Sequence, residues 1–233
     1  MKKKKYGMTV VCMTIGIMMI AVSCGGKKQE STDTEVQTAV VVETQAMNAT
    51  EAVKETESAL PAGEMYSYLT GEPVSETIGK QRPYAIMINN IETSLPQSGV
   101  SQAEMIYEAQ VESGITRLMA VFQDVDNIEK IGSIRSARHY YIDFANDNDA
   151  IYVHYGQSKY ALSRIEDDNI MTIHGLSGYE SKVFYRSSDR KAPHNVYTTG
   201  KMLAEGLEVT GLTRDYPAGY TPRLQFNHVD TEL

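Results

Sequence analysis

The sequence predicts an α/β domain, a layered fold with a mixed, partly parallel sheet flanked by helices, preceded by a disordered tether. Three continuous apolar runs, interleaved with amphipathic segments, have the length of strands that are buried on both faces. These runs are 84–88, 117–122 and 150–155. All nine arginines lie at or after Arg82, so composition also separates an arginine-free N-terminal part from a folded part.

The N-terminus has the parts of a secretory leader. Lysines occupy positions 2–5, and an uncharged apolar stretch at 8–22 is short for a helix that spans a membrane. Ala21-Val22-Ser23-Cys24 then resembles the lipobox of bacterial lipoproteins. We interpret 1–23 as a lipoprotein signal peptide and Cys24 as the lipidated residue, with an uncleaved signal anchor as the alternative. The mature chain is then expected on the outer face of the bacterial cytoplasmic membrane.

Cysteine content and charge disfavour several classes of function. The second cysteine, Cys12, lies in the leader, so the mature chain would have no thiol for a disulfide, a zinc cluster or catalysis. Removing the four leader lysines takes the formal net charge from -8 to -12, which disfavours nucleic acid as a partner. The histidines lack metal-ligand spacing and no glycine-rich nucleotide motif occurs, so we expect no metal and no cofactor.

Composition also sets the expected domain boundaries. Residues 24–66 are rich in Ser, Thr, Glu, Ala and Gln, and they have too few apolar side chains to offset the entropy of ordering. We predict a disordered tether there, with a short helix at 46–60 as the alternative. Residues 67–215 are predicted to form the α/β domain, and 216–233 a loop that follows it.

Capping signals and periodicity predict the elements of the first half of the domain. The strand at 84–88 follows Pro83. Ser101 and Glu104 have the spacing of a capping box and predict a helix that ends at Gly114. The next strand is 117–122, and 131–135 is expected to return antiparallel to it.

The second half begins with Ser136 as the expected N-cap of a helix whose apolar face is Ala137, Tyr140, Tyr141, Phe144 and Ala145. After the strand at 150–155, Ser158 is expected to cap a short helix that ends by Ile165. Weaker strands are expected at 171–174 and 183–185. Thr198 or Thr199 is expected to begin a last helix, which ends at Gly211.

Six motifs occur in order along the folded part, namely Arg82–Asn90, Pro96–Gly99, Tyr107–Glu108, Gly114–Arg117, Ile134–Arg138 and Arg190–Asn195. Together they resemble the YerB-like family of bacterial lipoproteins, over about Tyr66 to Leu233. The resemblance implies no particular activity. It does imply a further C-terminal domain, so we expect the loop at 216–233 to lead toward a domain that is missing from this chain.

Cationic side chains near predicted strand and helix ends indicate a binding site, because ligands of such sheets bind outside the carboxyl ends of the strands. Arg135 and Arg138 flank a predicted helix N-terminus, where backbone amides favour anions. The predicted ligand-binding residues are Arg117, Arg135, Ser136, Arg138, Arg190, Lys191 and Asn195. If they converge, they form a site for carboxylate or phosphate. The alternative is that these arginines pair with the domain's own acids, such as Glu104, Glu108 and Asp143.

Two histidines, His154 and His194, are the candidates for acid/base catalysis, although a lone histidine is more often a packed residue. Our first hypothesis is a lipid-anchored extracytoplasmic domain that binds an anionic ligand of the cell envelope, such as a cell-wall polymer, in an accessory role. The alternative is a cell-wall hydrolase or transferase with one of these histidines as general base. A structural module that docks on a membrane protein is a third possibility.

Overall fold

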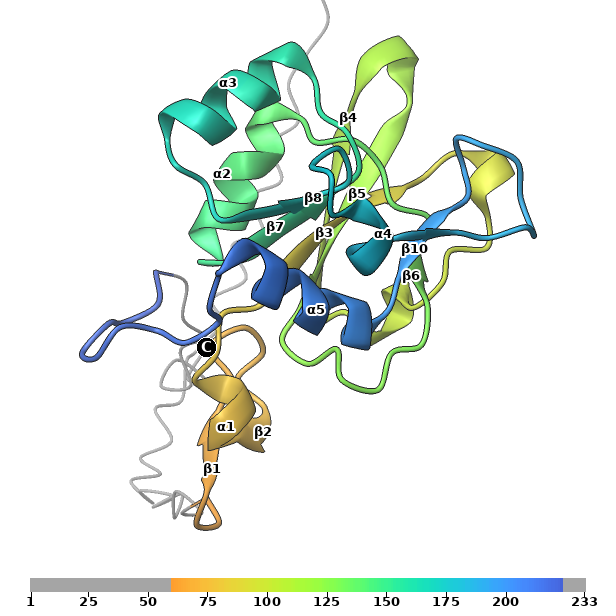
Figure 1. Cartoon of the computed structure of the whole chain (residues 1–233). Coiled ribbons are helices and arrows are strands. Elements are labelled where there is room, and N and C mark those ends of the chain that lie inside the picture. Colours follow the sequence, from red (N-terminus) through yellow and green to blue (C-terminus); the bar gives the residue numbers. More distant parts are fainter. Residues whose placement is uncertain (1–59, 224–233) are drawn as a thin grey trace, which may run out of the picture. The chain divides into compact units, whose positions relative to one another are not determined.

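A five-stranded mixed sheet forms the centre of the structure, a computed structural model that describes residues 60–223 (Figure 1). In spatial order its strands are β4 (Met105–Gln110), β5 (Thr116–Phe122), β3 (Tyr84–Asn89), β7 (Ile151–His154) and β8 (Thr172–His174). β5 is antiparallel to both β4 and β3, whereas β3, β7 and β8 run parallel to one another. The predicted α/β fold with a mixed, partly parallel sheet is thus confirmed.

Several predictions concern residues outside the described range. The signal peptide at 1–23, the lipidation site Cys24, most of the tether and residues 224–233 of the final loop belong to this group. Within 60–223, no helix combines the length and the apolar character needed to cross a membrane.

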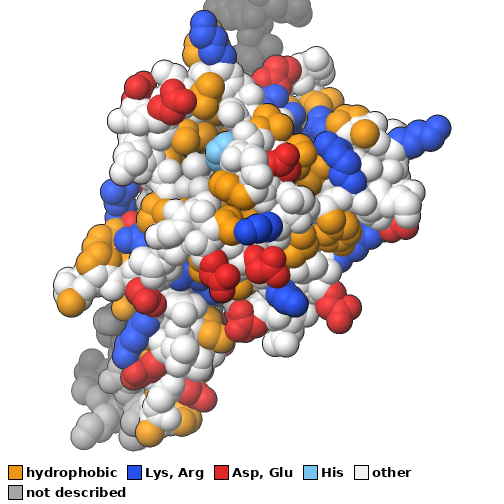
Figure 2. Space-filling model, viewed as in Figure 1, with side chains coloured by type: hydrophobic (Ala, Val, Ile, Leu, Met, Phe, Trp, Pro, Cys, Tyr) orange, Lys and Arg blue, Asp and Glu red, His pale blue; other side chains and the backbone are white. Residues whose placement is uncertain are grey.

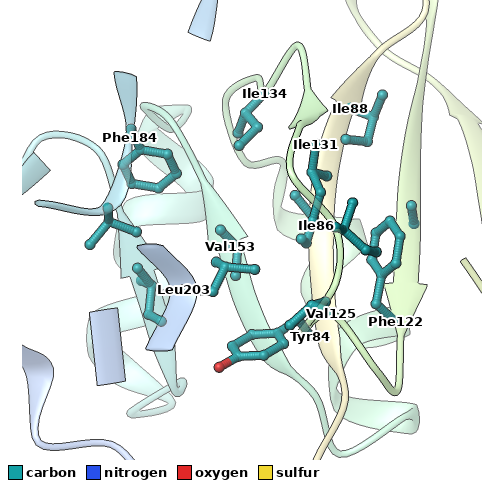
Figure 3. Close-up of a cluster of buried hydrophobic side chains, with 14 of the residues drawn as sticks. Tyr84, Ile86, Ile88, Phe122, Val125, Ile131, Ile134, Val153, Phe184 and Leu203 are labelled. Atoms are coloured by element: carbon teal, nitrogen blue, oxygen red, sulfur yellow. The ribbon is translucent and has the colours of Figure 1, made fainter. Parts of the chain in front are cut away.

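The central strand β3 explains why its sequence is a continuous apolar run. Its side chains alternate between two cores, with Tyr84, Ile86 and Ile88 in one and Ala85 and Met87 in the other. Figure 3 shows the first of these cores, in which β3 side chains lie among those of neighbouring elements. A strand that is buried on both faces has no solvent side on which polar residues would be favoured.

Two different layers cover the two faces of the sheet (Figure 1). One consists of α2 (His139–Asp147) and α3 (Lys159–Asp167), whose buried residues share the core of Ala85 and Met87. The other consists of α4 (Glu180–Val183), α5 (Gly200–Thr210) and a small antiparallel sheet of β6 (Ile131–Gly132), β10 (Val196–Thr198) and β9 (Tyr185–Arg186). Val183, Leu203 and Ile131 carry this layer into the first core.

Short elements complete the described chain. A hairpin of β1 (Glu64–Tyr66) and β2 (Pro73–Ser75) precedes α1 (Glu76–Gly79), so regular structure begins inside the range predicted for the tether. Three single 3₁₀ turns lie in the loops around β4, namely η1 (Glu92–Ser94), η2 (Val100–Gln102) and η3 (Glu112–Gly114).

The segment after α5 is fastened to the start of β3. The Arg82 amide donates to the Arg214 carbonyl at 2.6 Å, and the Arg214 side chain donates back to the Arg82 carbonyl at 2.7 Å. The Arg82 guanidinium lies 4.8 Å from the ring centre of Tyr216 and 5.3 Å from that of Tyr220. Asp149 accepts hydrogen bonds from the Tyr220 hydroxyl and the Arg223 amide. We call these contacts the Arg82–Arg214 clasp.

The helix predicted after Ser101 is wrong, because residues 105–110 form the edge strand β4. Met105, Tyr107 and Ala109 are half-buried while the residues between them are exposed, which is the two-residue period of a strand. The Glu104 carboxylate accepts from the Gln123 amide at 2.9 Å across the sheet, so it does not complete a capping box. Pairing with β5 therefore overrides the local helix signal.

Three finer predictions also need correction. Residues 131–135 do not pair with β5, because β6 pairs with β10 and Ile134 bridges to Ile88 of β3. Ser136 is not an N-cap, because α2 begins at His139, with Arg138 at the cap position and no side-chain cap. Val183 belongs to α4, and the predicted strand there is instead β9.

The caps of two other helices are as predicted. Ser158 accepts the Ala161 amide at 3.2 Å at the start of α3. Thr199 accepts the Met202 amide at 3.0 Å at the start of α5, and Gly211 ends that helix at a φ of 71°.

Burial predicts which isoleucine of the sheet stabilises the fold. Ile86 is fully buried in β3, whereas Ile106 on β4 is 47% exposed. We expect Ile86→Ala to lower the free energy of unfolding by about 2–5 kcal/mol, and Ile106→Ala by less than about 1 kcal/mol. Urea denaturation measures both values. Equal losses would contradict the assignment of β4 as a half-exposed edge strand.

Candidate functional site

The segment 133–137 crosses the carboxyl ends of β3 and β7 and is held there by its backbone. The Ser133 carbonyl accepts the Asn89 amide at 2.9 Å. The Arg135 amide donates to Met87 at 3.0 Å, and its carbonyl accepts the Tyr155 amide at 3.0 Å. Because β5 is antiparallel to β3, it begins at this same end of the sheet. The crossing segment therefore lies at the end where a binding site was predicted.

Three predicted arginines converge on the crossing segment. The side chains of Arg117 and Arg138 both donate to the Ser136 carbonyl, and Arg138 also donates to the Ala137 carbonyl at 2.8 Å. Burial, followed by the positive charges of Arg138 and Arg135, lowers the pKa of Arg117 to about 10. Ser136 thus contributes its carbonyl to the site, and the positive charges of the arginines lie close to one another.

One carboxylate compensates part of this charge. Glu112, in the turn between β4 and β5, accepts two hydrogen bonds of 2.6 Å from Arg138, a bidentate pair. The hydrogen bond from Arg138 lowers the pKa of Glu112 to about 2. Arg138 is the only one of the predicted site arginines that forms such an ion pair within residues 60–223.

Arg135 is only partly satisfied. Its guanidinium donates to the Pro193 carbonyl at 3.1 Å, while its buried Nε has no hydrogen-bond partner among the described residues. Burial, followed by the charge of Arg138, lowers the pKa of Arg135. A half-buried cation without a carboxylate is the kind of group that an added anion stabilises.

The remaining predicted cations come from the loop between β9 and β10. Arg190 donates to the carbonyls of Ser94 and Pro96, the latter at 2.7 Å, and so joins this loop to the one after β3. Asn195 accepts from Arg186 at 2.8 Å and positions the loop, while Lys191 is exposed. Blue side chains gather at the right of Figure 2, the side to which this loop projects in Figure 1.

His194 lies beside these arginines. The Asn89 side-chain amide donates to His194 Nδ1 at 2.9 Å, which places the proton of the neutral ring on Nε2. Burial lowers the pKa of His194, and the charges of Arg135 and Arg190 lower it further. We call Arg117, Arg135, Arg138, Arg190 and His194 the arginine cluster.

His154 has a different environment. It is 1% exposed, and its ring nitrogens lie 2.8 Å from the Gly156 carbonyl and 2.9 Å from the Thr172 hydroxyl. Its ring also stacks on His174, with 5.7 Å between the ring centres. Burial lowers the pKa of His154 to about 3, partly opposed by the Gly156 carbonyl. These contacts favour a packed histidine over a general base.

The acids that we named as alternative partners have other contacts. Glu104 accepts from the Gln123 amide, Glu108 from Thr116 and Asn90, and Asp143 pairs with Arg164. Sequence reasoning missed two residues of the site, Glu112 and Asn89. Asn89 directly follows the apolar part of β3, so the strand-end rule could have indicated it, whereas nothing in the sequence distinguishes Glu112 from other acids.

The arginine cluster does not line the cavity beside the Arg82–Arg214 clasp. A cavity of about 390 Å³ lies beside the Arg82–Arg214 clasp, where Arg82, Asp149 and Tyr220 line it. In the cluster, Arg135, Arg138, Arg190 and His194 are half-buried, so their side chains reach solvent. No group of three or more potential metal ligands occurs within the described part of the chain.

The fold and the arginine cluster define an α/β domain that presents cationic side chains at the carboxyl ends of its strands. A family model described as "Protein of unknown function (DUF3048) N-terminal domain" matches residues 69–213, and the chain belongs to this family. The predicted resemblance to YerB-like proteins is thereby confirmed.

Two comparisons with the YerB protein of Bacillus subtilis, one of sequence and one of structure, illustrate this relationship. The chain is 36% identical over 143 residues to "Putative lipoprotein YerB" of strain 168. This match covers 61% of this chain and 43% of that protein. The crystal structure of the YerB protein matches with a TM-score of 0.60 at 34% identity, over 65% of this chain and 52% of that one. The chain thus matches only about half of the length of YerB.

The environment of His154 predicts acid sensitivity. Its pKa falls from an ordinary 6.5 to about 3 on folding, so below pH 6.5 only the unfolded chain takes up the proton. The stability that neutral His154 contributes to the fold is complete above about pH 6.5 and is lost as the pH falls toward about 3. We expect this histidine to lower the free energy of unfolding by about 2 kcal/mol between about pH 7.5 and about pH 5.

Urea denaturation at several pH values tests this expectation. His154→Gln should reduce the loss at acidic pH, whatever its effect on stability at neutral pH. His139→Gln, a change at an exposed histidine, is the matched control and should leave the pH dependence unchanged. An unchanged pH dependence in His154→Gln would contradict this expectation, because it would show that His154 accepts a proton as readily in the folded state as in the unfolded state.

Proposed function

We propose that this protein is a lipid-anchored extracytoplasmic domain that binds an anionic ligand of the cell envelope through the arginine cluster. Arg117, Arg135, Arg138 and Arg190 would supply the charge, with Ser136, Lys191 and Asn195 beside them. The observation that carries the proposal is Arg135, a half-buried cation with an unpartnered Nε and no ion pair among residues 60–223.

The charge balance of the cluster supports this proposal. Its four guanidinium groups share one ion-paired carboxylate, that of Glu112, although the whole chain has a formal net charge of -8. Burial, and after it the mutual repulsion of the arginines, lowers the pKa values of Arg117 and Arg135. A phosphate or carboxylate ligand would relieve this repulsion and accept several charge-assisted hydrogen bonds.

The anchoring part of the proposal rests on the leader and on a relative. The basic and apolar leader precedes Cys24 in a lipobox-like setting, and the B. subtilis relative bears the name "Putative lipoprotein YerB". Lipidation of Cys24 would keep the domain at the outer face of the cytoplasmic membrane, where anionic envelope polymers are within its reach.

The alternative, a cell-wall hydrolase or transferase, depends mainly on His194. Its Nδ1 is occupied by Asn89, so the ring nitrogen that is left for a ligand, Nε2, carries the proton. A nitrogen in this state donates a hydrogen bond and does not accept a proton. His194 therefore fits a ligand contact better than a general base, and the catalytic role stays a prediction without a supporting contact.

Alanine substitution of Arg135 tests the proposed function. With inorganic polyphosphate as a soluble probe, we expect Arg135→Ala to weaken binding at least about tenfold, because the loss of one charge-assisted contact removes about 1.5–3 kcal/mol. Isothermal titration calorimetry measures the affinity. Binding of the unchanged protein should also weaken steeply with added NaCl.

The matched control is Arg164→Ala. Arg164 is a surface arginine on α3 that pairs with Asp143 and Asp168, so the substitution removes the same charge outside the cluster. We expect it to change affinity by less than about twofold. Equal effects of the two substitutions would contradict a local site. A loss of several kcal/mol of stability in Arg135→Ala alone would instead make Arg135 a structural residue.

A further inference from the structure

Exposed aliphatic side chains surround the arginine cluster. The two most exposed large aliphatic residues of the described chain are Leu176, at 63%, and Leu95, at 50%. A third, Ile115, is 41% exposed. All three lie in loops at the same end of the sheet, after β8, after β3 and before β5. Large apolar side chains that are exposed beside a charged site indicate an interaction surface.

Contacts tie these residues to the cluster. Leu95 lies between Ser94 and Pro96, whose carbonyls bind Arg190. A Cβ placed on Gly156 would lie 3.0 Å from the Ser136 hydroxyl and 3.9 Å from Leu176, so Leu176 lies next to the crossing segment. Ile115 follows the turn that contains Glu112, the partner of Arg138. We call Leu95, Ile115 and Leu176 the aliphatic rim.

The charges at this end are mainly positive. The acids are Glu92, which is exposed, Glu108, which accepts from Thr116 and Asn90, Glu112, which pairs with Arg138, and Asp189, which pairs with Lys130 at 3.0 Å. The cations without an ion pair in the described chain are Arg117, Arg135, Arg186, Arg190 and Lys191. Cations and aliphatic side chains thus occur together on an otherwise acidic protein.

We propose that the ligand of the arginine cluster is the surface of a membrane that contains anionic phospholipids, with the aliphatic rim inserting between the headgroups. This inference rests on the proposed function and makes its ligand specific. Arginines bind lipid phosphates as they would any phosphate, whereas a water-soluble polymer would leave the aliphatic rim in water. Peripheral membrane binding combines buried apolar area with attraction to anionic lipids.

Vesicle binding tests this inference. The mature chain with Cys24→Ser, which contains every described residue but cannot be lipidated, is sedimented with vesicles of phosphatidylglycerol and phosphatidylcholine or of phosphatidylcholine alone. We expect binding only to the anionic vesicles. The double variant Leu95→Ser with Leu176→Ser should bind them at least about tenfold more weakly, because it removes apolar area from the contact. Its affinity for soluble polyphosphate should stay the same.

The control is Ile106→Ser with Leu162→Ser, which removes two exposed aliphatic side chains outside the aliphatic rim and should leave vesicle binding unchanged. Unchanged vesicle binding in the Leu95 and Leu176 variant overturns the membrane proposal. Polyphosphate binding without vesicle binding in the Cys24→Ser chain also overturns it, but leaves the proposed function intact. If neither probe binds, both proposals fail.

Discussion

The site depends on the backbone hydrogen bonds that fix the crossing segment against β3 and β7. The Arg135 amide donates to the carbonyl of Met87 in β3, and the Arg135 carbonyl accepts from the amide of Tyr155, directly after β7. Since these bonds involve only main-chain atoms of residue 135, they do not depend on its side chain. The arginine at 135 is therefore not needed to build this part of the fold. Its retention in a half-buried position without a carboxylate is a feature that folding alone does not explain.

The strands that the sequence predicted are those whose burial is nearly complete. β3 and β7 are buried along their whole length, and a strand with two apolar faces leaves a continuous run in the sequence. β4 is a half-buried edge strand, and its residues Met105, Ile106 and Ala109 fit a helical stripe as well as Met105, Tyr107 and Ala109 fit a strand. Only the pairing with β5 decides between these patterns, and that pairing is a tertiary contact.

The same distinction applies to the arginine cluster. The sequence indicated Arg117 at a strand start, Arg135 and Arg138 at a helix start and Arg190 in a later loop, because such positions need only the order of elements along the chain. The sequence could not predict the contacts between side chains. Asn89 and His194 are 105 positions apart, and nothing in the sequence distinguishes Glu112, the partner of Arg138, from other acids. Which acid meets which arginine depends on how the β4–β5 hairpin folds over α2. Of the three acids that we named, Glu108 is on β4, Asp143 is on α2 and Glu104 directly precedes β4, but all three have other partners.

The Arg82–Arg214 clasp has a mechanical consequence. The chain just before β3 is joined to the chain just after α5 by two hydrogen bonds, one of them from the Arg214 side chain, and by two tyrosine rings. The clasp lies at the amino end of β3, whereas the arginine cluster lies at its carboxyl end. A pull on the two segments that flank the domain would strain the clasp first and would reach the sheet only after the clasp had opened. The domain could thus be under tension from its neighbours while the geometry of the arginine cluster stays unchanged.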